Sequence, residues 1–158
     1  MKPSVYIGQN VGSLDFNKFI TLKKYGNKSV INASKLAEAF FEESVSMDEM
    51  TYNIERNDDN QLHIHILGKA NNDINIIKEI KSFIKPVRME QISRRLIIKT
   101  KHNNNVDSFQ DKWVTINGVN FTGKKYSLYL ENIIQKYNAA LYSNKYNDYG
   151  IANNYLKK

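Results

Sequence analysis

The sequence predicts an α+β protein in which helices pack on an antiparallel sheet. The first observation is that hydrophobic residues alternate with period two in some segments and recur at helical spacing in others. The second is the order of these segments, which runs strand, helix, strand, strand, helix, strand and then a further helix. The third is the length of 158 residues, which suits one domain. We therefore expect a single domain over residues 1–158.

The first half of the chain predicts three strands and one helix. Residues 18–23 are rich in β-branched and aromatic side chains, which favour a strand. Asn32 can cap a helix over residues 33–43, whose apolar side chains share one face. Residues 51–56 and 62–67 alternate between polar and apolar side chains on either side of a polar turn. These two segments predict a β-hairpin.

A second helix is expected to begin near Asn72 and Asp73 and to stop before Pro86, because the residue before a proline disfavours the helical conformation. Its expected apolar stripe consists of Ile74, Ile77, Ile80 or Lys81, and Ile84.

The remaining chain predicts strands over 95–100 and 113–116, followed by the longest helix. That helix is expected to run from Lys124 or Lys125 to about residue 143. The polar and aromatic segment from about 144 to 158 predicts an irregular tail. The domain core is thus expected over about 18–143.

Composition narrows the class of partner and excludes several kinds of site. There are 23 Lys and Arg residues against 16 Asp and Glu, a net charge of +7, which favours a polyanionic partner. The chain has no cysteine, so disulfides, thiolate metal sites and cysteine nucleophiles are excluded. No apolar run is long enough to cross a membrane, and the N-terminus lacks the apolar segment of a signal peptide. We expect a protein of the cytoplasm of a bacterial or viral-host cell, with no membrane partner.

The predicted hairpin brings together a possible metal site. His63 and His65 are two residues apart on one strand, so their side chains lie on the same face. A three-residue loop would place Glu55 directly opposite His63 and, in the same register, pair apolar residues on the buried face. A Glu-His-His group with open coordination positions suits Mg²⁺ or Mn²⁺ that also holds a phosphate. The alternative is a hydrogen-bonded histidine pair without a metal.

The same stretch carries a family resemblance. The sequence IERNDDNQLHIHIL resembles the second motif of the HUH endonucleases, a superfamily of rolling-circle replication initiators, relaxases and single-strand transposases. Residues 18–23 are similar to their first motif, an apolar strand that contains threonine. Residues 126–130 resemble the third motif, a tyrosine on a helix, although Asn132 stands where the family often has lysine. The resemblance covers about 18–143 and implies a ferredoxin-like or RRM-like HUH fold.

The choice of tyrosine rests on the expected last helix. Tyr126 and Tyr137 fall within its apolar stripe, whereas Tyr129 falls at the edge, beside Lys125 and Lys136. Nearby lysines would favour the phenolate, so Tyr129 is the preferred nucleophile, and Tyr126 and Tyr137 are the alternatives.

The resemblance implies a reaction on single-stranded DNA. A metal held by Glu55, His63 and His65 would polarise a phosphate, and the tyrosine would attack it to leave a 5′-phosphotyrosine and a free 3′-hydroxyl. Such nicking and rejoining serves the replication or mobilisation of a plasmid, phage or transposon. The sequence has no P-loop motif, so no nucleotide cofactor is expected.

Basic and aromatic residues are the expected nucleic-acid contacts. Aromatic side chains that could stack on bases are Phe109, Trp113, Tyr142 and Tyr146. Lysines that could contact phosphates are Lys23, Lys24, Lys69, Lys99, Lys101, Lys125 and Lys136.

Other functions stay open on the sequence alone. One is a non-catalytic nucleic-acid-binding or anti-defence protein that keeps the fold but not the reaction. Another is a phage regulatory domain similar to KilA-N, which residues 20–41 faintly resemble. A two-histidine phosphoesterase would need two His-x-Thr/Ser motifs, which the sequence lacks.

Overall fold

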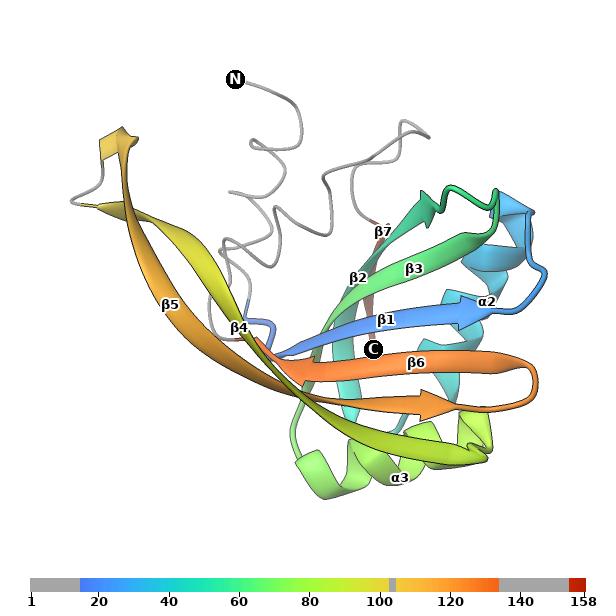
Figure 1. The fold of residues 1–158 in the computed structure, drawn as a ribbon. Helices are drawn as coiled ribbons and strands as arrows, with labels where there is room; N and C mark the ends of the chain where they lie inside the picture. Colours follow the sequence, from blue (N-terminus) through green and yellow to red (C-terminus); the bar gives the residue numbers. More distant parts are fainter. Residues whose placement is uncertain (1–14, 103–104, 134–153) are drawn as a thin grey trace.

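The computed structural model describes residues 15–102, 105–133 and 154–158. These residues form a seven-stranded antiparallel sheet with two helices packed on it (Figure 1). The expected fold class is therefore confirmed. The elements are β1 (Lys18–Lys24), α2 (Val30–Glu43), β2 (Met47–Arg56), β3 (Leu62–Ala70), α3 (Asp73–Ile84), β4 (Arg88–His102), β5 (Asn105–Thr122), β6 (Tyr126–Asn132) and β7 (Asn154–Lys157).

The strands lie in the order β4-β5-β6-β1-β3-β2-β7. Each pair of neighbours is antiparallel. The four central strands lie in the order β6-β1-β3-β2, and the chain reaches β6 only after β1-α2-β2-β3-α3 and the strands β4 and β5. Strands β4 and β5 project from the sheet as a long two-stranded ribbon (Figure 1). Strand β1 thus lies between β6 and β3, which brings residues distant in sequence onto one continuous surface.

Both helices begin at side-chain caps. The backbone N–H of Asn32 donates to Ser29 Oγ at 3.3 Å, so the cap of α2 is Ser29, three residues before the expected cap at Asn32. Asn72 caps α3 as expected, because its Oδ1 accepts from two backbone N–H groups of the first turn. Lys85 ends α3 with a φ of 51°, directly before Pro86.

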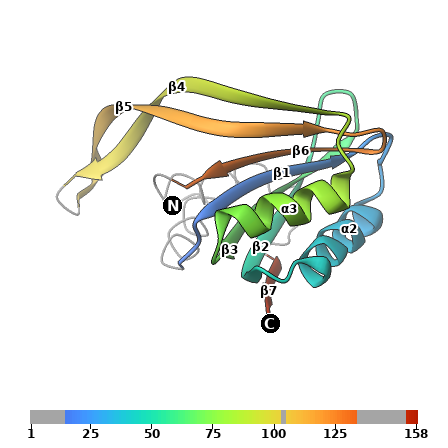
Figure 2. The ribbon, with the colours of Figure 1, turned by 90° about the horizontal axis from the view of Figure 1, so that it is seen from below.

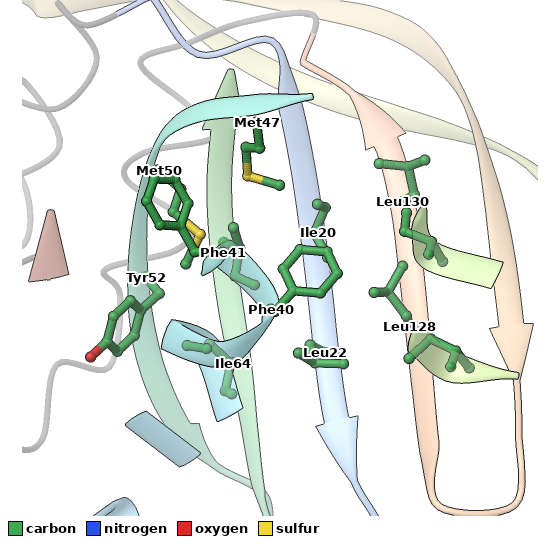
Figure 3. Packing of buried hydrophobic residues seen from close by; sticks show 14 of the residues in the cluster. Ile20, Leu22, Phe40, Phe41, Met47, Met50, Tyr52, Ile64, Leu128 and Leu130 are labelled. Carbon is green, nitrogen blue, oxygen red and sulfur yellow. The ribbon is translucent and has the colours of Figure 1, made fainter. Parts of the chain in front are cut away.

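The core lies between the helices and one face of the sheet (Figures 2 and 3). Ile20 and Leu22 of β1 and Ile64 and Ile66 of β3 are each at most 1% exposed on that face. The buried side of α3 consists of Ile76, Ile80 and Ile84, whereas Ile74 is 66% exposed. The expected stripe is therefore partly wrong, because isoleucines occupy two neighbouring faces of this helix and packing against the sheet selects one of them.

The expected last helix is also wrong over its first part. Residues Tyr126–Asn132 form β6, which pairs with β1 on one side and β5 on the other. Leu128 and Leu130 are buried on the helix-covered face, as alternation in a strand requires. The tyrosine and leucine spacing fits both periods over so short a segment, and pairing with two strands decides it. Residues 134–143, including Lys136 and Tyr137, lie outside the described part.

Two other segments differ in extent from the prediction. The expected strands 95–100 and 113–116 are parts of the much longer β4 and β5. The expected irregular tail includes β7, which pairs with the edge of β2. Within the described residues, neither helix has the length and hydropathy needed to span a bilayer.

Candidate metal centre

The β2–β3 hairpin adopts the register expected from the sequence. Glu55 pairs with His63, Ile54 with Ile64, and Tyr52 with Ile66. The Asn57 N–H donates to the Gln61 carbonyl at 2.8 Å, which closes the turn as the three-residue loop requires. Alternation along both strands then directs the isoleucines to the core and the glutamate and histidines to the opposite face.

Glu55, His63 and His65 converge on one point of this opposite face. His65 Nε2 lies 2.7 Å from Glu55 Oε2, and His63 Nε2 lies 3.2 Å from the same oxygen. The two Nε2 atoms are 3.2 Å apart. Their side chains are 14%, 13% and 4% exposed, in sequence order. A glutamate and two imidazoles in so small a space are either one shared hydrogen-bonded group or the ligands of a cation.

The spacing fits a cation. Ligands at neighbouring corners of an octahedron around an ion at about 2.1 Å lie about 3 Å apart, close to each of the three distances. Two imidazoles and a carboxylate are typical ligands of Mn²⁺, Fe²⁺ or Zn²⁺, whereas Mg²⁺ prefers oxygen. Glu55, His63 and His65 are therefore a possible metal site, and their nitrogen donors favour Mn²⁺ over Mg²⁺ among the two ions expected.

The second ring nitrogen of His65 has a contact that suits metal binding through Nε2. Thr21 Oγ1 of β1 lies 3.3 Å from His65 Nδ1, so it can accept from an Nδ1–H and leave Nε2 with its lone pair. Thr21 pairs with His65 in the β1–β3 register, which fixes this contact. His63 Nδ1 is buried and has no hydrogen-bond partner among the described groups.

Burial also affects the charge of the site. Burial, and then the neighbouring His65, lower the pKa of His63, although Glu55 opposes the shift. A lowered pKa keeps the imidazole of His63 neutral at physiological pH. The neutral form is the one that binds a metal ion, so the surroundings of His63 suit a ligand.

The histidines and Tyr129 line the same pocket. This pocket has a volume of about 450 Å³, and its walls come from β1, β3, β5 and β6 as well as Arg94 of β4. Thr21 lies between the two groups, because it pairs with His65 on one side and with Tyr129 on the other. The strand order thus places the expected tyrosine and the two histidines on one face, two strands apart.

The surroundings of Tyr129 differ from those expected. Its hydroxyl donates to Glu131 Oε2 at 2.8 Å, and its ring covers Gly118, where a Cβ would lie only 2.3 Å from the hydroxyl oxygen. Burial and Glu131 raise the pKa of Tyr129 to about 12, although Arg94 acts in the opposite direction. The expectation that lysines favour its phenolate is therefore wrong. Arg94, whose Cζ lies 5.4 Å from the ring centroid, is the cation that faces it.

The expected basic residues that the structure describes do not all lie together, because Lys23, Lys24 and Lys125 lie where β1 ends and β6 begins, whereas Lys69 lies at the far end of β3. Lys23 lines the pocket, and its Nζ lies 3.9 Å from Asp59 Oδ2. Lys69 lies 3.7 Å from Asp15, and Lys24 and Lys125 are exposed. The side chains of Lys99 and Lys101, and all of Lys136, are outside the described part.

Arg94 and Glu131 are the polar residues of this face that sequence reasoning missed. The only signal for Glu131 was its position two residues after Tyr129, which puts both side chains on one face once the segment is a strand. Arg94 could not be found without the β4–β5 register, which sets it opposite Ile116.

No protein-family model, curated protein or solved structure matches this chain. The possible chemistry of the site therefore rests on its own geometry. That geometry places two imidazoles, a phenol and a guanidinium around one open pocket. Glu55 lies beside the imidazoles, and Glu131 accepts the hydrogen bond of the phenol. Such a set suits the handling of a phosphate group.

Proposed function

We propose that the protein nicks and rejoins single-stranded DNA in a metal-dependent reaction with a 5′-phosphotyrosine intermediate. The observation that carries the proposal is the shared pocket of His63, His65 and Tyr129. The strand order β6-β1-β3-β2, with β6 in the place of the fourth strand and the β4–β5 ribbon inserted before it, also supports the ferredoxin-like fold that the HUH resemblance implies. Replication or mobilisation of a plasmid, phage or transposon is the expected setting.

A divalent cation held by Glu55, His63 and His65 would supply polarisation of the scissile phosphate. The chain's own residues supply the nucleophile and its activation. The Tyr129 oxygen attacks the phosphorus while its proton passes to Glu131, which accepts the hydrogen bond from this hydroxyl at 2.8 Å. The bond from phosphorus to the 3′-oxygen breaks, and that oxygen takes a proton from water and leaves as a hydroxyl. The reverse reaction rejoins the strand without a nucleotide cofactor.

Arg94 and Lys23 fit the same reaction. Arg94 Nη2 lies 3.8 Å from Glu131 Oε2 and its guanidinium lies over the Tyr129 ring. A guanidinium there can stabilise both a forming phenolate and a phosphate oxygen. Lys23 lines the pocket on the side of the histidines, where it can contact the backbone of the DNA strand.

The second candidate is a nucleic-acid-binding protein without cleavage. It is favoured by the raised pKa of Tyr129, because a phenol with a pKa of about 12 is a poor nucleophile until it loses its proton. In that case the Glu-His-His group is structural or binds a metal that only positions the nucleic acid.

A covalent-adduct assay distinguishes the two candidates. End-labelled single-stranded DNA incubated with the protein and Mn²⁺ should give an adduct that survives a denaturing gel and carries the fragment downstream of the nick. Tyr129→Phe removes only the hydroxyl, so it should eliminate the adduct while DNA binding persists. Glu131→Gln should slow adduct formation, because an amide cannot take the phenol proton.

Tyr126→Phe is the matched control, because Tyr126 lies on the same strand but packs against the core. An adduct that persists in Tyr129→Phe and disappears in Tyr126→Phe or Tyr137→Phe would assign the nucleophile to another tyrosine. If no adduct forms on any DNA, including the origin of the element that encodes the protein, the binding function is the correct one.

A further inference from the structure

The β4–β5 ribbon extends well beyond the sheet. Its two strands pair from Arg88 and Thr122 as far as Lys101 and Phe109, whereas β6 accompanies β5 only from Gly118 to Thr122. The part of β5 before Gly118 therefore pairs with β4 alone. This two-stranded part of the ribbon curves away from the body of the domain (Figures 1 and 2). A two-stranded ribbon alone gains little stability in water, so a projecting one of this length calls for another role.

An exposed tryptophan lies at the start of this projecting part. Trp113 is 65% exposed, and Ile97, directly opposite on β4, is 52% exposed. On the other face of the ribbon, Ile116 is only 8% exposed. Trp113 lies on the same face of β5 as Phe121, which is 1% exposed in the core, so the apolar face of the sheet continues onto the ribbon and is exposed there. The position of Trp113 suits contact with a partner.

Arg95 adds a positive charge to this apolar surface. Its Cζ lies 5.9 Å from the centroid of the Trp113 ring, within the range of a cation–π contact. An exposed aromatic ring with a guanidinium beside it matches a nucleotide of a single strand, because the base can stack on the ring while the phosphate meets the cation. Duplex DNA offers no free base face to such a ring.

The charge of the ribbon selects the same partner. The sequences of β4 and β5 together contain six Lys or Arg residues and three Asp or Glu residues. The whole chain has a net charge of +7. This excess complements a polyanion, whereas a protein partner held by Trp113 and Ile97 alone would not need it.

Arg94 and Arg95 connect the ribbon to the pocket. They are neighbours on β4, and their side chains alternate between the two faces, Arg94 over Tyr129 and Arg95 over Trp113. A strand bound at one surface can therefore continue to the other across β4.

We propose that the Arg95–Trp113 face of the β4–β5 ribbon docks single-stranded DNA, with a base stacked on Trp113 and a phosphate beside Arg95. The inference takes the class of partner from the proposed function but does not require cleavage. The ribbon surface would hold the strand outside the pocket and so determine which segment of DNA reaches it.

Fluorescence offers a direct test, because Trp113 is the only tryptophan of the chain. Titration with an oligothymidylate, which forms no duplex, should quench the emission of the intact protein to a saturating value. Trp113→Ala should raise the Kd about tenfold or more, as measured by the anisotropy of a labelled oligonucleotide. Trp113→Phe should retain most of the affinity, because the phenyl ring still stacks.

Two further variants separate stacking from apolar contact and from charge. Ile97→Ala is the matched control, since it removes an exposed apolar side chain of the same face but no ring, and it should leave the Kd nearly unchanged. Arg95→Ala should reduce the slope of log Kd against log salt by about 0.7. The unfolding temperature of each variant shows whether it is folded.

The results of these experiments test DNA binding by the ribbon separately from DNA cleavage in the pocket. Quenching that persists in the double variant His63→Ala/His65→Ala, with or without adduct formation, supports the ribbon as an independent surface. DNA binding with neither quenching nor an effect of Trp113→Ala overturns it, even if the protein cleaves DNA. Self-association that Trp113→Ala abolishes, without any DNA effect, would assign the surface to a second copy instead and likewise overturn it.

Discussion

The two faces of the sheet differ in what they carry, even within a single strand: one face packs in the hydrophobic core, and the other holds the candidate metal site. On β3, Ile64 and Ile66 are covered by the helices, while His63 and His65 lie on the opposite face with Glu55. The helix-covered face is almost entirely apolar, whereas the opposite face buries polar groups such as Asn53 and Thr51, which are 4% and 1% exposed. Buried polar side chains cost free energy. The face that carries the Glu-His-His group therefore also concentrates the buried polar side chains.

The comparison also shows why both faces depend on one register. A shift of one residue between β2 and β3 would expose the isoleucines and separate Glu55 from His63. Packing of the core thus fixes the metal ligands in place without contacting them. A substitution on the helix-covered face should therefore lower the stability of the fold and leave metal binding intact. A substitution of a metal ligand should abolish metal binding instead.

Ile64→Ala gives the largest expected loss of stability. Ile64 is 1% exposed in the core, and truncation of such a side chain costs about 3 kcal/mol in the free energy of unfolding. Denaturant unfolding measures this loss. The melting temperature of the variant should still rise on addition of Mn²⁺, because the ligands on the other face are unchanged. A variant that lost its metal response while still folded would break the separation of the two faces.

A charged group on the helix side sharpens the comparison. Glu79 of α3 accepts hydrogen bonds from the hydroxyls of Ser44 and Ser46 at 2.7 and 2.6 Å, and from the backbone N–H groups of Val45 and Ser46 at 2.8 Å. It thereby ties α3 to the segment between α2 and β2. Burial alone would raise the pKa of Glu79, but these hydrogen bonds together lower it.

Glu79→Gln should cost about 2 kcal/mol of the free energy of unfolding at neutral pH, because an amide offers one acceptor where the carboxylate offers two. Since the folded pKa is lowered, the carboxylate stabilises the fold above its unfolded pKa of about 4.3. That contribution disappears as the pH falls through the folded pKa. The difference between the two proteins in urea unfolding should therefore shrink below about pH 4. A difference in stability that does not change with pH would show that the charge of the Glu79 carboxylate makes no contribution.

The sequence predicts the hairpin and its site because two independent patterns agree there. Both the apolar alternation of Ile54, Ile64 and Ile66 and the pairing of Glu55 with His63 require the same loop. The capped start of α3 at Asn72 follows from equally local chemistry. Local patterns of this kind need no knowledge of the distant chain.

The errors lie where distant contacts decide. Residues 126–132 are a strand because β1 and β5 pair with them on both sides, which no local period reveals. The same pairing places Tyr129 over Gly118 and sets the Glu131 carboxylate against its hydroxyl, which the expected helix did not predict. The choice between the isoleucines of α3 likewise depends on the sheet beneath them.

The central claim is that Glu55, His63 and His65 form a metal centre, and titration with Mn²⁺ tests it most directly. Calorimetry should show one binding site, and the ion should raise the stability of the folded protein by about 2.7 kcal/mol at a concentration of 100 times Kd. Glu55→Gln and His63→Ala/His65→Ala should abolish both signals, each compared with the same variant without metal. Glu79→Gln is the matched carboxylate control and should retain both. A rise in melting temperature of equal size in the double histidine variant would contradict the account.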